Sequence, residues 1–390
     1  MIRFRGAAAM LTALTMLLSV AGCSGQEPSG SQATVESTVA VTQPTEAPQE
    51  VKLDKIISGM TLEEKVGQLF YVRCPDEGAT QWITDYHLGG FVLFGRDFAE
   101  KTVEQVRHDI QSYQQASIKV PLLIGVDEEG GSVVRVSDVL RDEPFLSPKD
   151  YFADGGWQAV ENAEREKADL LLSLGINVNL APVVDITSDE ETFIFRRSFS
   201  DDPALVCSFA ERTVGIYRDK KLGSTLKHFP GYGDNEDTHT GIAHDSRPYS
   251  DFLTKDFLPF EAGIKAGADC VMVSHNIMES VDAERPASLS DKVHQILRRD
   301  LNFNGVIMTD DLIMEAITDY TGSQTAAVTA VQAGNDLLCC SDLENQYPAV
   351  LTAVQNQEIP MEQLDRSVKR VLKWKQSLGL LDNIDPTEAP

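Results

Sequence analysis

The sequence predicts an α/β fold in which a single domain forms a (β/α)8, TIM-like barrel. Short apolar segments rich in β-branched residues alternate with longer segments whose apolar residues recur at helical spacing. The alternation runs through eight units over roughly 330 residues, as many strand–helix units as this kind of barrel requires. A doubly wound open sheet of parallel strands is the alternative arrangement of the same elements.

The expected strands are short apolar segments, and the expected helices follow them along the chain. We place the strands at residues 68–72, 90–94, 122–126, 178–184, 224–227, 270–274, 305–309 and 336–340. We place helices at residues 101–115, 159–174, 203–221, 251–266 and 291–300. No fixed-length repeat is visible, and we expect no second domain.

The N-terminus has the pattern of an export signal. Arg3 and Arg5 precede an apolar segment, residues 7–20, which is too short to span a bilayer comfortably. The following Val-Ala-Gly-Cys at residues 20–23 resembles a bacterial lipobox, which implies a signal peptide over residues 1–22 and lipidation of Cys23. A plain secretory signal with an incidental cysteine is the alternative.

The next segment, residues 23–50, is rich in Ser, Thr, Gln, Pro and Glu and has few large apolar residues. Such a segment cannot bury enough apolar surface to offset its ordering entropy, so we predict a disordered tether. The barrel is expected over residues 51–382, and residues 383–390 are expected to form a short tail.

The formal charge of −26 limits the classes of partner. Removing a leader with two arginines and no acidic residue takes this charge from −26 to −28. So strong an acidic excess argues against nucleic acid and against a polybasic membrane contact. We therefore expect attachment to the bacterial cell membrane through the N-terminal lipid only, on the extracytoplasmic side.

No cofactor or metal site is expected. Beyond Cys23 the number of cysteines is odd and their spacing fits no zinc motif, so we interpret them as small buried hydrophobic residues. A disulfide between two of them remains open. These cysteines are Cys74, Cys207, Cys270, Cys339 and Cys340.

Charged and polar residues follow the expected strands, where the active site of such a barrel is built. Asp127 follows the third strand and precedes a Gly-Gly turn, so its carboxylate can accept hydrogen bonds from two hydroxyl groups of a ligand. Asp185 and His275 also lie at strand ends, and we interpret them as supporting residues. Asp310 and Asp311 follow the seventh strand. A carboxylate there can stabilise an oxocarbenium-like centre or attack it.

The segment at residues 227–241 is the strongest functional signal. Glycines and a proline exclude a core helix or strand, so we predict a polar loop at a strand end. In it Asp237 and His239 are two residues apart, and a carboxylate-oriented histidine is a suitable general acid and base. A solvated surface loop with incidental histidines is the alternative.

Three motifs resemble family 3 glycoside hydrolases, in the branch of the β-N-acetylglucosaminidases. They are DEEGGSVVR at residues 127–135, KHFPGYGD…DTHTG at residues 227–241 and TDD at residues 309–311. The resemblance covers the chain after the tether. It implies an exo-acting, retaining hydrolase that releases terminal β-linked N-acetylglucosamine.

The resemblance also implies roles for individual residues. Asp310 is the nucleophile, and His239 with Asp237 is the acid/base dyad. Asp311, before a helix-like segment, is interpreted as a helix N-cap. Ser132 stands where an arginine is common in the family. The residues implied to bind the terminal sugar are Asp127, Arg135, Arg197, Lys227 and His228.

The expected substrates are carbohydrates with a terminal N-acetylglucosamine, such as peptidoglycan fragments or chitin-type oligosaccharides. The alternatives are a phosphorylase or β-glucosidase on the same scaffold, and a non-catalytic, lipid-anchored sugar-binding protein. The aglycone preference and the oligomeric state stay open at this point.

Overall fold

The computed structural model describes residues 48–384, except residues 236, 239, 240 and 322–325. By contacts the chain divides into Met1–Thr45 and Glu46–Pro390, and the described residues all lie in the second unit. The expected signal peptide, Cys23 and nearly all of the expected tether therefore lie outside the described residues. In the described part of the chain, no helix is both long and apolar enough to cross a membrane.

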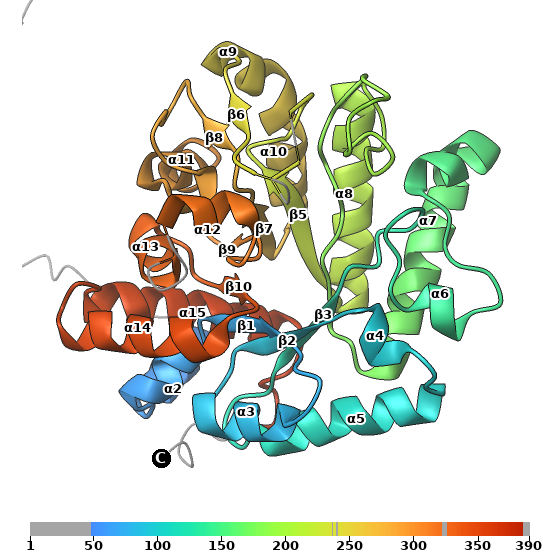
Figure 1. Ribbon diagram of the computed structural model, residues 1–390. Helices are drawn as coiled ribbons and strands as arrows, with labels where there is room; N and C mark the ends of the chain where they lie inside the picture. Colours follow the sequence, from blue (N-terminus) through green and yellow to red (C-terminus); the bar gives the residue numbers. More distant parts are fainter. Residues whose placement is uncertain (1–47, 236, 239–240, 322–325, 385–390) are drawn as a thin grey trace, which may run out of the picture. The chain divides into compact units, whose positions relative to one another are not determined.

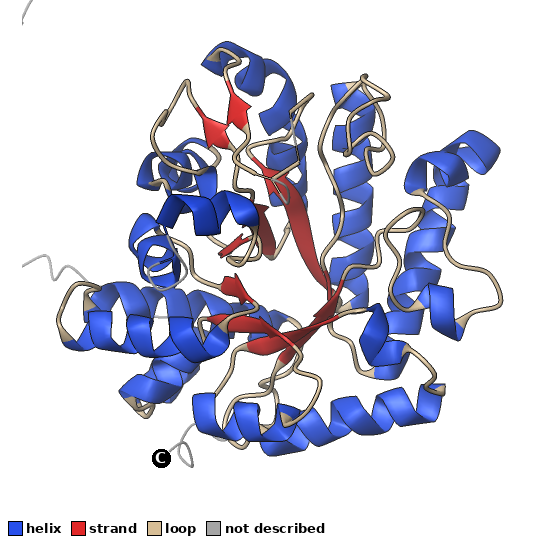
Figure 2. Ribbon diagram, in the orientation of Figure 1, coloured by secondary structure: helices blue, strands red, loops and turns tan. Residues whose placement is uncertain are grey.

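Eight parallel strands form the centre of the fold, and helices surround them (Figures 1 and 2). The strand order is β10-β1-β2-β3-β4-β5-β7-β9, and a bridge between Met308 and Leu337 brings the two end strands together. The sheet is thus a nearly closed barrel, which confirms the predicted (β/α)8 fold and excludes the open sheet. The strands are β1 (Phe70–Arg73), β2 (Gly90–Leu93), β3 (Leu123–Val126), β4 (Val178–Asn179), β5 (Gly223–Phe229), β7 (Cys270–Val273), β9 (Val306–Thr309) and β10 (Leu338–Cys340).

The helices follow the strands in sequence, and several begin at side-chain caps. Thr102 caps one of them by accepting a hydrogen bond from Gln105 N at 3.3 Å, with Gln105 bonding back in a capping box. The helices are α1 (Pro48–Ser58), α2 (Leu62–Gly67), α3 (Ala79–Tyr86), α4 (Gly95–Phe98), α5 (Val103–Ala116), α6 (Ser137–Leu140), α7 (Pro148–Leu174), α8 (Pro203–Lys220), α9 (Tyr249–Asp251), η1 (Phe252–Asp256), α10 (Phe257–Ala266), η2 (Ala287–Leu289), α11 (Asp291–Gln295), η3 (Ile296–Asp300), α12 (Glu315–Thr321), α13 (Ala326–Ala333), α14 (Leu343–Gln355) and α15 (Met361–Ser377).

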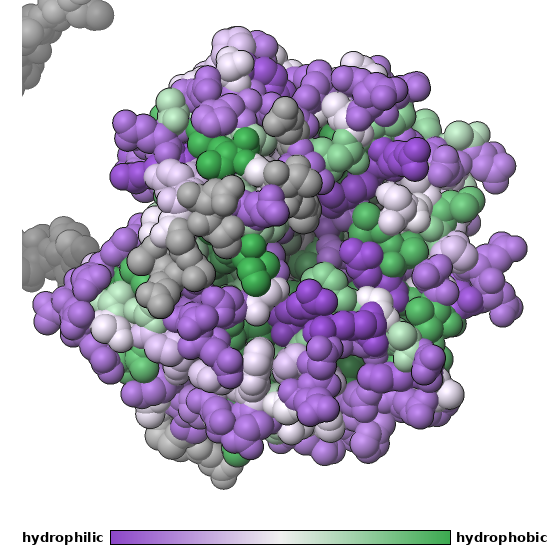
Figure 3. All heavy atoms as spheres, in the orientation of Figure 1, coloured by the Kyte–Doolittle hydropathy of each residue, from purple (hydrophilic) through white to green (hydrophobic). Residues whose placement is uncertain are grey.

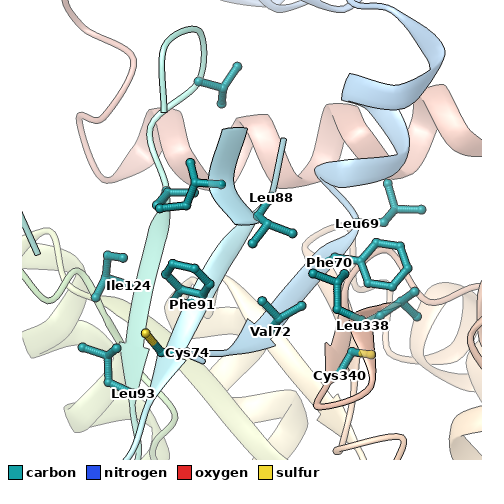
Figure 4. Close-up of a cluster of buried hydrophobic side chains, with 14 of the residues drawn as sticks. Leu69, Phe70, Val72, Cys74, Leu88, Phe91, Leu93, Ile124, Leu338 and Cys340 are labelled. Carbon is teal, nitrogen blue, oxygen red and sulfur yellow. The ribbon is translucent and has the colours of Figure 1, made fainter. Parts of the chain in front are cut away.

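Alternation along each strand separates the barrel interior from the helix-facing layer. On β1, Tyr71 belongs to the cluster that fills the barrel, whereas Phe70 and Val72 pack in the outer cluster. Figure 4 shows the outer cluster, in which side chains of β1, β2, β3 and β10 gather on one side of the strands. Inside, Gly125 leaves room for the Tyr71 hydroxyl, because a Cβ atom at Gly125 would lie 1.6 Å from that oxygen.

The structure differs from the expected elements at several boundaries. The fourth strand is shorter than expected because Pro182, which has no N–H to donate, interrupts the segment. Helix α7 begins earlier than expected, and Gly155 and Gly156 break it internally. Helix α1 begins at Pro48, inside the expected tether. Two short strands that we did not expect, β6 (His244–Asp245) and β8 (Ile277–Met278), pair with each other.

The five cysteines that the structure describes are free thiols, so the disulfide that the sequence left open is not formed among them. Four are buried, as predicted, and Cys207 is half-buried. Burial raises the pKa of the Cys74 and Cys340 thiols to about 12, which keeps them protonated and chemically inert at neutral pH.

The last helix, α15, packs against the interior cluster of the barrel through Val371 and Trp374. The Trp374 ring lies against Gly223, the first residue of β5. This helix therefore covers the end of the barrel where the strands begin, opposite the end where the polar residues gather. The next residue, Lys375, is fully buried, and its Nζ donates a hydrogen bond to Gln68 Oε1 at 2.7 Å.

Lys375 should make stability depend on pH. Burial lowers the pKa of its ammonium group from an ordinary value of 10.5 to about 7. Between these values the unfolded chain binds a proton that the folded chain lacks, so this residue makes stability rise with pH across that window. We expect Lys375→Met to remove a slope of at most about 1.4 kcal/mol per pH unit.

Denaturant unfolding of both proteins at neutral and mildly alkaline pH measures this slope. The difference in unfolding free energy between Lys375→Met and the wild type should shift in favour of the wild type as the pH rises. A difference that stays constant with pH would show that Lys375 keeps its proton in the folded chain.

Candidate active site

A pocket of about 390 Å³ lies where the barrel strands end. This volume is in the range of small-molecule binding sites. Hydrophilic surface predominates on this face of the molecule, with apolar patches between (Figure 3). The pocket is lined by Arg73, Val92, Phe94, Asp127, Glu129, Val133, Arg135, Leu180, Arg197, Lys227, His228, Met272, Asp310, Asp311, Ile313, Met314 and Cys339.

One wall of the pocket is a compact network of ion pairs. Lys227, near the end of β5, donates to Asp127 Oδ1 at 2.6 Å and lies 2.7 Å from Glu129 Oε1. Arg197 holds the same Glu129 carboxylate in a bidentate contact, with distances of 2.9 Å from Nε and 2.8 Å from Nη2. A bidentate contact fixes the plane of both groups, so the donors keep a defined direction toward the pocket.

These charges stabilise each other at working pH. Burial alone would raise the pKa of the Glu129 carboxyl, but the charges of Arg197 and Lys227 outweigh it and hold this pKa well below its usual range. Burial alone would lower the pKa of Lys227, and the charges of Asp127 and Glu129 raise it instead. Both cations therefore remain available as donors to a ligand.

His228 is oriented by a carboxylate beneath the pocket. Asp185 Oδ2 lies 2.7 Å from His228 Nδ1, and the same carboxylate accepts from the backbone N of His228 and of Tyr232 at 3.1 and 2.8 Å. The other ring nitrogen, Nε2, lies 3.0 Å from Arg197 Nη2. Because a guanidinium can only donate, Nε2 must accept, so we assign the proton to Nδ1, which donates it to Asp185.

The two aspartates after β9 have different surroundings. Asp310 N donates to Val273 O at 3.0 Å, which holds Asp310 at the end of the barrel, and its Oδ1 accepts from Asp311 N at 2.8 Å. Asp311 Oδ1 accepts from Ile313 N at 3.2 Å and from Ser341 N at 3.1 Å. Burial raises the pKa of the Asp311 carboxyl.

Asp311 is not the helix N-cap that we predicted. Helix α12 begins only at Glu315, and the Asp311 side chain instead closes a turn over Ile313 and ties it to Ser341. The Asp311 side chain still has a structural role, because it accepts hydrogen bonds from the backbone of Ile313 and Ser341.

The predicted acid/base loop is described only in part. His239 lies outside the described residues, and Asp237 is half-buried. Next to it, the buried Thr238 hydroxyl lies 2.6 Å from the Tyr232 hydroxyl. Tyr232 N in turn donates to Asp185, so the start of this loop is tied to the carboxylate that orients His228.

The loop glycines have a packing role that the sequence did not indicate. Gly233 has a φ of 55°, and a Cβ atom there would lie 2.6 Å from Arg247 Nη1. Arg247 also donates to Gly231 O at 3.2 Å and is held by Asp245 and Asp256. These glycines therefore allow the loop to pack closely on an ion-paired arginine.

Comparison with known proteins identifies the family to which this chain belongs. The family model described as "Glycosyl hydrolase family 3 N terminal domain" matches residues 61–374. A β-hexosaminidase of Mycobacterium tuberculosis, LpqI, is 32% identical over 382 residues, which are 94% of this chain and 96% of LpqI. The chain belongs to glycosyl hydrolase family 3.

Further matches cover shorter stretches of this chain. A β-hexosaminidase of Xanthomonas campestris pv. campestris is 37% identical over 270 residues, covering 67% of this chain and 80% of the relative. The solved LpqI structure superposes with a TM-score of 0.75 at 30% identity, over 83% of this chain and 96% of LpqI.

A family 3 β-N-acetylglucosaminidase from Paenibacillus sp. str. FPU-7 superposes with a TM-score of 0.77 at 34% identity. The match covers 82% of this chain but only 63% of the Paenibacillus chain. Together these matches show a glycoside hydrolase of the β-N-acetylhexosaminidase type.

Most of the expected site residues of this family 3 hydrolase meet in one pocket. Asp185 and His275 are supporting residues: Asp185 holds His228, and His275 Nε2 lies 3.0 Å from Asp311 O. Ser132 is exposed and does not line the pocket. The expected residues that line it are Asp127, Arg135, Arg197, Lys227, His228 and Asp310.

The sequence analysis missed Glu129, Arg73 and Phe94 as pocket residues. Glu129 could have been found, because it lies two residues after Asp127 and continues the same side of an extended segment. Arg73 ends β1 and Phe94 follows β2, and neither belongs to a motif that the sequence analysis singled out, so their sequence context contained no comparable signal.

Glu129→Gln should destabilise this family 3 hydrolase. The substitution keeps the shape of the side chain but leaves Arg197 and Lys227, both largely buried, with less compensating negative charge. Breaking a buried ion pair typically costs about 3 kcal/mol, so we expect a loss of that order in the free energy of unfolding.

Denaturant unfolding measures this loss, and Glu143→Gln, at an exposed position, is the control for removal of one negative charge. Equal effects of the two substitutions would contradict the role of Glu129 as the counter-charge of the pocket.

Proposed function

We propose that this protein releases terminal β-linked N-acetylglucosamine from carbohydrate chains by a retaining double displacement. The observation that carries the proposal is the placement of Asp310. Its backbone is fixed at the end of β9, and it lines the same pocket as the Asp127–Lys227–Glu129–Arg197 network. A carboxylate thus shares a pocket with donors and an acceptor suited to sugar hydroxyls.

The charged network is suited to holding the non-reacting part of a sugar ring. Asp127 accepts hydrogen bonds from hydroxyl groups, while Lys227 and Arg197 donate to them. Because the ion pairs already hold these groups in place, the protein loses little side-chain entropy when the sugar binds. Such positioning lowers the entropic part of the barrier.

The floor of the pocket supports an exo mode of action. Leu180, Met272 and Cys339 line the pocket and also belong to the apolar cluster that fills the barrel. A sugar that enters from the open side meets this packed layer and cannot extend through it. Only the end of a chain therefore fits, which is what removal of a terminal residue requires.

Asp310 is the better nucleophile of the two adjacent aspartates. The Asp311 carboxylate accepts hydrogen bonds from Ile313 N, Ser341 N and the Ser341 hydroxyl, so its oxygens already have donors. In the first step a carboxylate oxygen of Asp310 bonds to the anomeric carbon, and the glycosidic oxygen departs with a proton from the general acid. In the second step water attacks the anomeric carbon, gives its proton to the same group and releases Asp310.

We assign the acid/base role to His239, with Asp237 orienting its ring. This assignment comes from the sequence motif, because His239 lies outside the described residues. The loop that carries it starts beside His228 and Asp185, next to the pocket.

We also propose that the protein acts outside the cytoplasm, held to the bacterial cell membrane by lipid on Cys23. The lipobox-like sequence at residues 20–23 supports this location.

Cys23→Ala should move the protein from the detergent-requiring membrane fraction to a soluble secreted form, because the variant lacks the thiol that carries the lipid. An unchanged fractionation would contradict the proposal.

Replacing Asp310 should remove nearly all turnover while leaving the fold intact. Asp310→Asn removes the charge that attacks the anomeric carbon, and the backbone bond to Val273 does not involve the side chain. A slow fluorosugar based on N-acetylglucosamine should label Asp310 in the wild type, as peptide mass spectrometry would show. A label on Asp311 would overturn the assignment.

His239→Ala should slow substrates with poor leaving groups far more than activated aryl glycosides. A nitrophenyl group departs with little protonation, whereas the sugar of a disaccharide needs a proton, and general acid catalysis is typically worth about 10²–10⁴-fold. Kinetics on a nitrophenyl N-acetylglucosaminide and on a disaccharide measure this contrast. Equal losses on both substrates would show that His239 binds or positions sugar instead.

A further inference from the structure

The side chain of Tyr232, in the loop after β5, has no role in the reaction described above. Its ring makes edge contacts with the rings of His228, at a centroid distance of 5.1 Å, and of Phe193, at 4.9 Å. It also packs with Val183 and Ile194 in a small buried cluster. Close packing of this kind restricts a side chain to one rotamer. The Tyr232 hydroxyl therefore has a defined position in the folded chain.

That hydroxyl contacts the segment to which we assign the acid/base role. Tyr232 Oη lies 2.6 Å from Thr238 Oγ1, and both side chains are buried. Thr238 stands directly between Asp237 and His239 in the sequence. Consecutive Cα atoms are only about 3.8 Å apart, so a displacement of Thr238 also displaces both of its neighbours. A contact that holds Thr238 therefore holds the residue that joins the proposed dyad.

Tyr232 is also tied to a residue of the pocket wall. Its backbone N donates to Asp185 Oδ1 at 2.8 Å, and Asp185 Oδ2 lies 2.7 Å from Nδ1 of His228, which lines the pocket. Asp185 and His228 are buried. Buried polar groups that are hydrogen-bonded to one another have little freedom to move separately. Tyr232 thus relates the position of Thr238 to the pocket, through its backbone on one side and its hydroxyl on the other.

The contact between the two hydroxyls does not change with pH in the working range. Burial raises the pKa of the Tyr232 hydroxyl far above its ordinary value, and the negative charge of Asp310 raises it further. This hydroxyl therefore stays protonated over the whole range in which a histidine titrates. A contact that positions an acid/base residue has to persist in this way, because that residue gives up its proton in one step and regains it in the next.

We propose that Tyr232 and Thr238 are positioning residues for proton transfer, and that the contact between their hydroxyls sets where the Asp237–His239 segment stands relative to the pocket. Neither Tyr232 nor Thr238 lines the pocket, so they act through the segment that they hold and not by contact with the sugar. The inference rests on the proposed function, since it takes His239 to be the proton donor. A donor has to lie within about 3 Å of the departing oxygen, so a small displacement of the segment lowers the rate.

The test removes one hydroxyl at a time and keeps the shape of the side chain. Tyr232→Phe removes the phenolic oxygen, Thr238→Val keeps the branched shape without the hydroxyl, and Thr238→Ser keeps the hydroxyl. Tyr347→Phe is the matched control. Tyr347 is also buried, its hydroxyl donates to Glu63 O at 3.1 Å, and it does not line the pocket.

Two substrates distinguish positioning of the acid from a purely structural contact. One is a nitrophenyl N-acetylglucosaminide, which departs with little protonation, and the other is a disaccharide of two β-linked N-acetylglucosamines, which needs a proton. The kcat/KM of both is measured for every variant, because this constant reports on the first step, in which the leaving group takes the proton. His239→Ala is measured in parallel as the reference for complete loss of the acid.

We expect Tyr232→Phe and Thr238→Val each to lower kcat/KM for the disaccharide about tenfold, a part of the 10²–10⁴-fold that general acid catalysis is typically worth. The nitrophenyl substrate should lose less than about twofold, which also shows that the variants fold. Thr238→Ser and Tyr347→Phe should leave both constants unchanged. The double variant of Tyr232→Phe and Thr238→Val should lose about as much as either single variant, because both substitutions remove the same contact.

The outcomes separate this inference from the proposed function. Equal losses on the two substrates in Tyr232→Phe and Thr238→Val, full activity of both, or failure of both to fold would overturn the inference. If His239→Ala still slows the disaccharide selectively, the hydrolase proposal stays intact. A loss in Thr238→Ser as large as in Thr238→Val would show that the hydroxyl does not hold the segment, which also overturns the inference. Equal losses on both substrates in His239→Ala would contradict the acid/base assignment itself, and with it the role of Tyr232.

Discussion

The buried carboxylate of Glu129 is the interaction on which the site depends. It is shared by Arg197 and Lys227, which come from a loop after β4 and from β5, so a single negative charge joins three separate parts of the barrel. Lys227 is in addition paired with Asp127. Without Glu129, largely buried cations would lie close together with less compensation, and desolvation would disfavour their charged forms. The Glu129 carboxylate thus keeps the donors that line the pocket charged and in place.

Backbone hydrogen bonds distinguish two adjacent, chemically identical residues. Asp310 is placed by the bond from its own N to Val273, which leaves its side chain out of that contact. Asp311 uses its side chain to hold Ile313 and Ser341, and so joins the β9 end to the residue that follows β10. We propose a chemical role for Asp310, whereas the Asp311 side chain has a structural one. The two residues differ in the atoms that bond to their neighbours: the backbone N of Asp310 bonds to Val273, whereas the side-chain oxygen of Asp311 bonds to Ile313 and Ser341.

The pocket combines regions of different charge balance. Around Lys227 and Arg197 the cations are paired, and the neutral hydroxyls of a sugar can exchange hydrogen bonds with both signs of charge. Around Phe94 the guanidiniums of Arg73 and Arg135 approach one ring.

Sequence alone determined the parts of this protein that depend on local pattern. The alternation of short apolar strands with amphipathic helices predicted the barrel, and polar residues directly after strands predicted the pocket, because parallel strands all end at one face. Local pattern could not show that Arg197 would reach Glu129, 68 residues away, or that Arg73 and Arg135 would lie against one ring. Nor could it show that Asp311 caps a turn instead of a helix. Such contacts depend on how strands close around a common axis, and only the tertiary structure decides which distant side chains then share the same space.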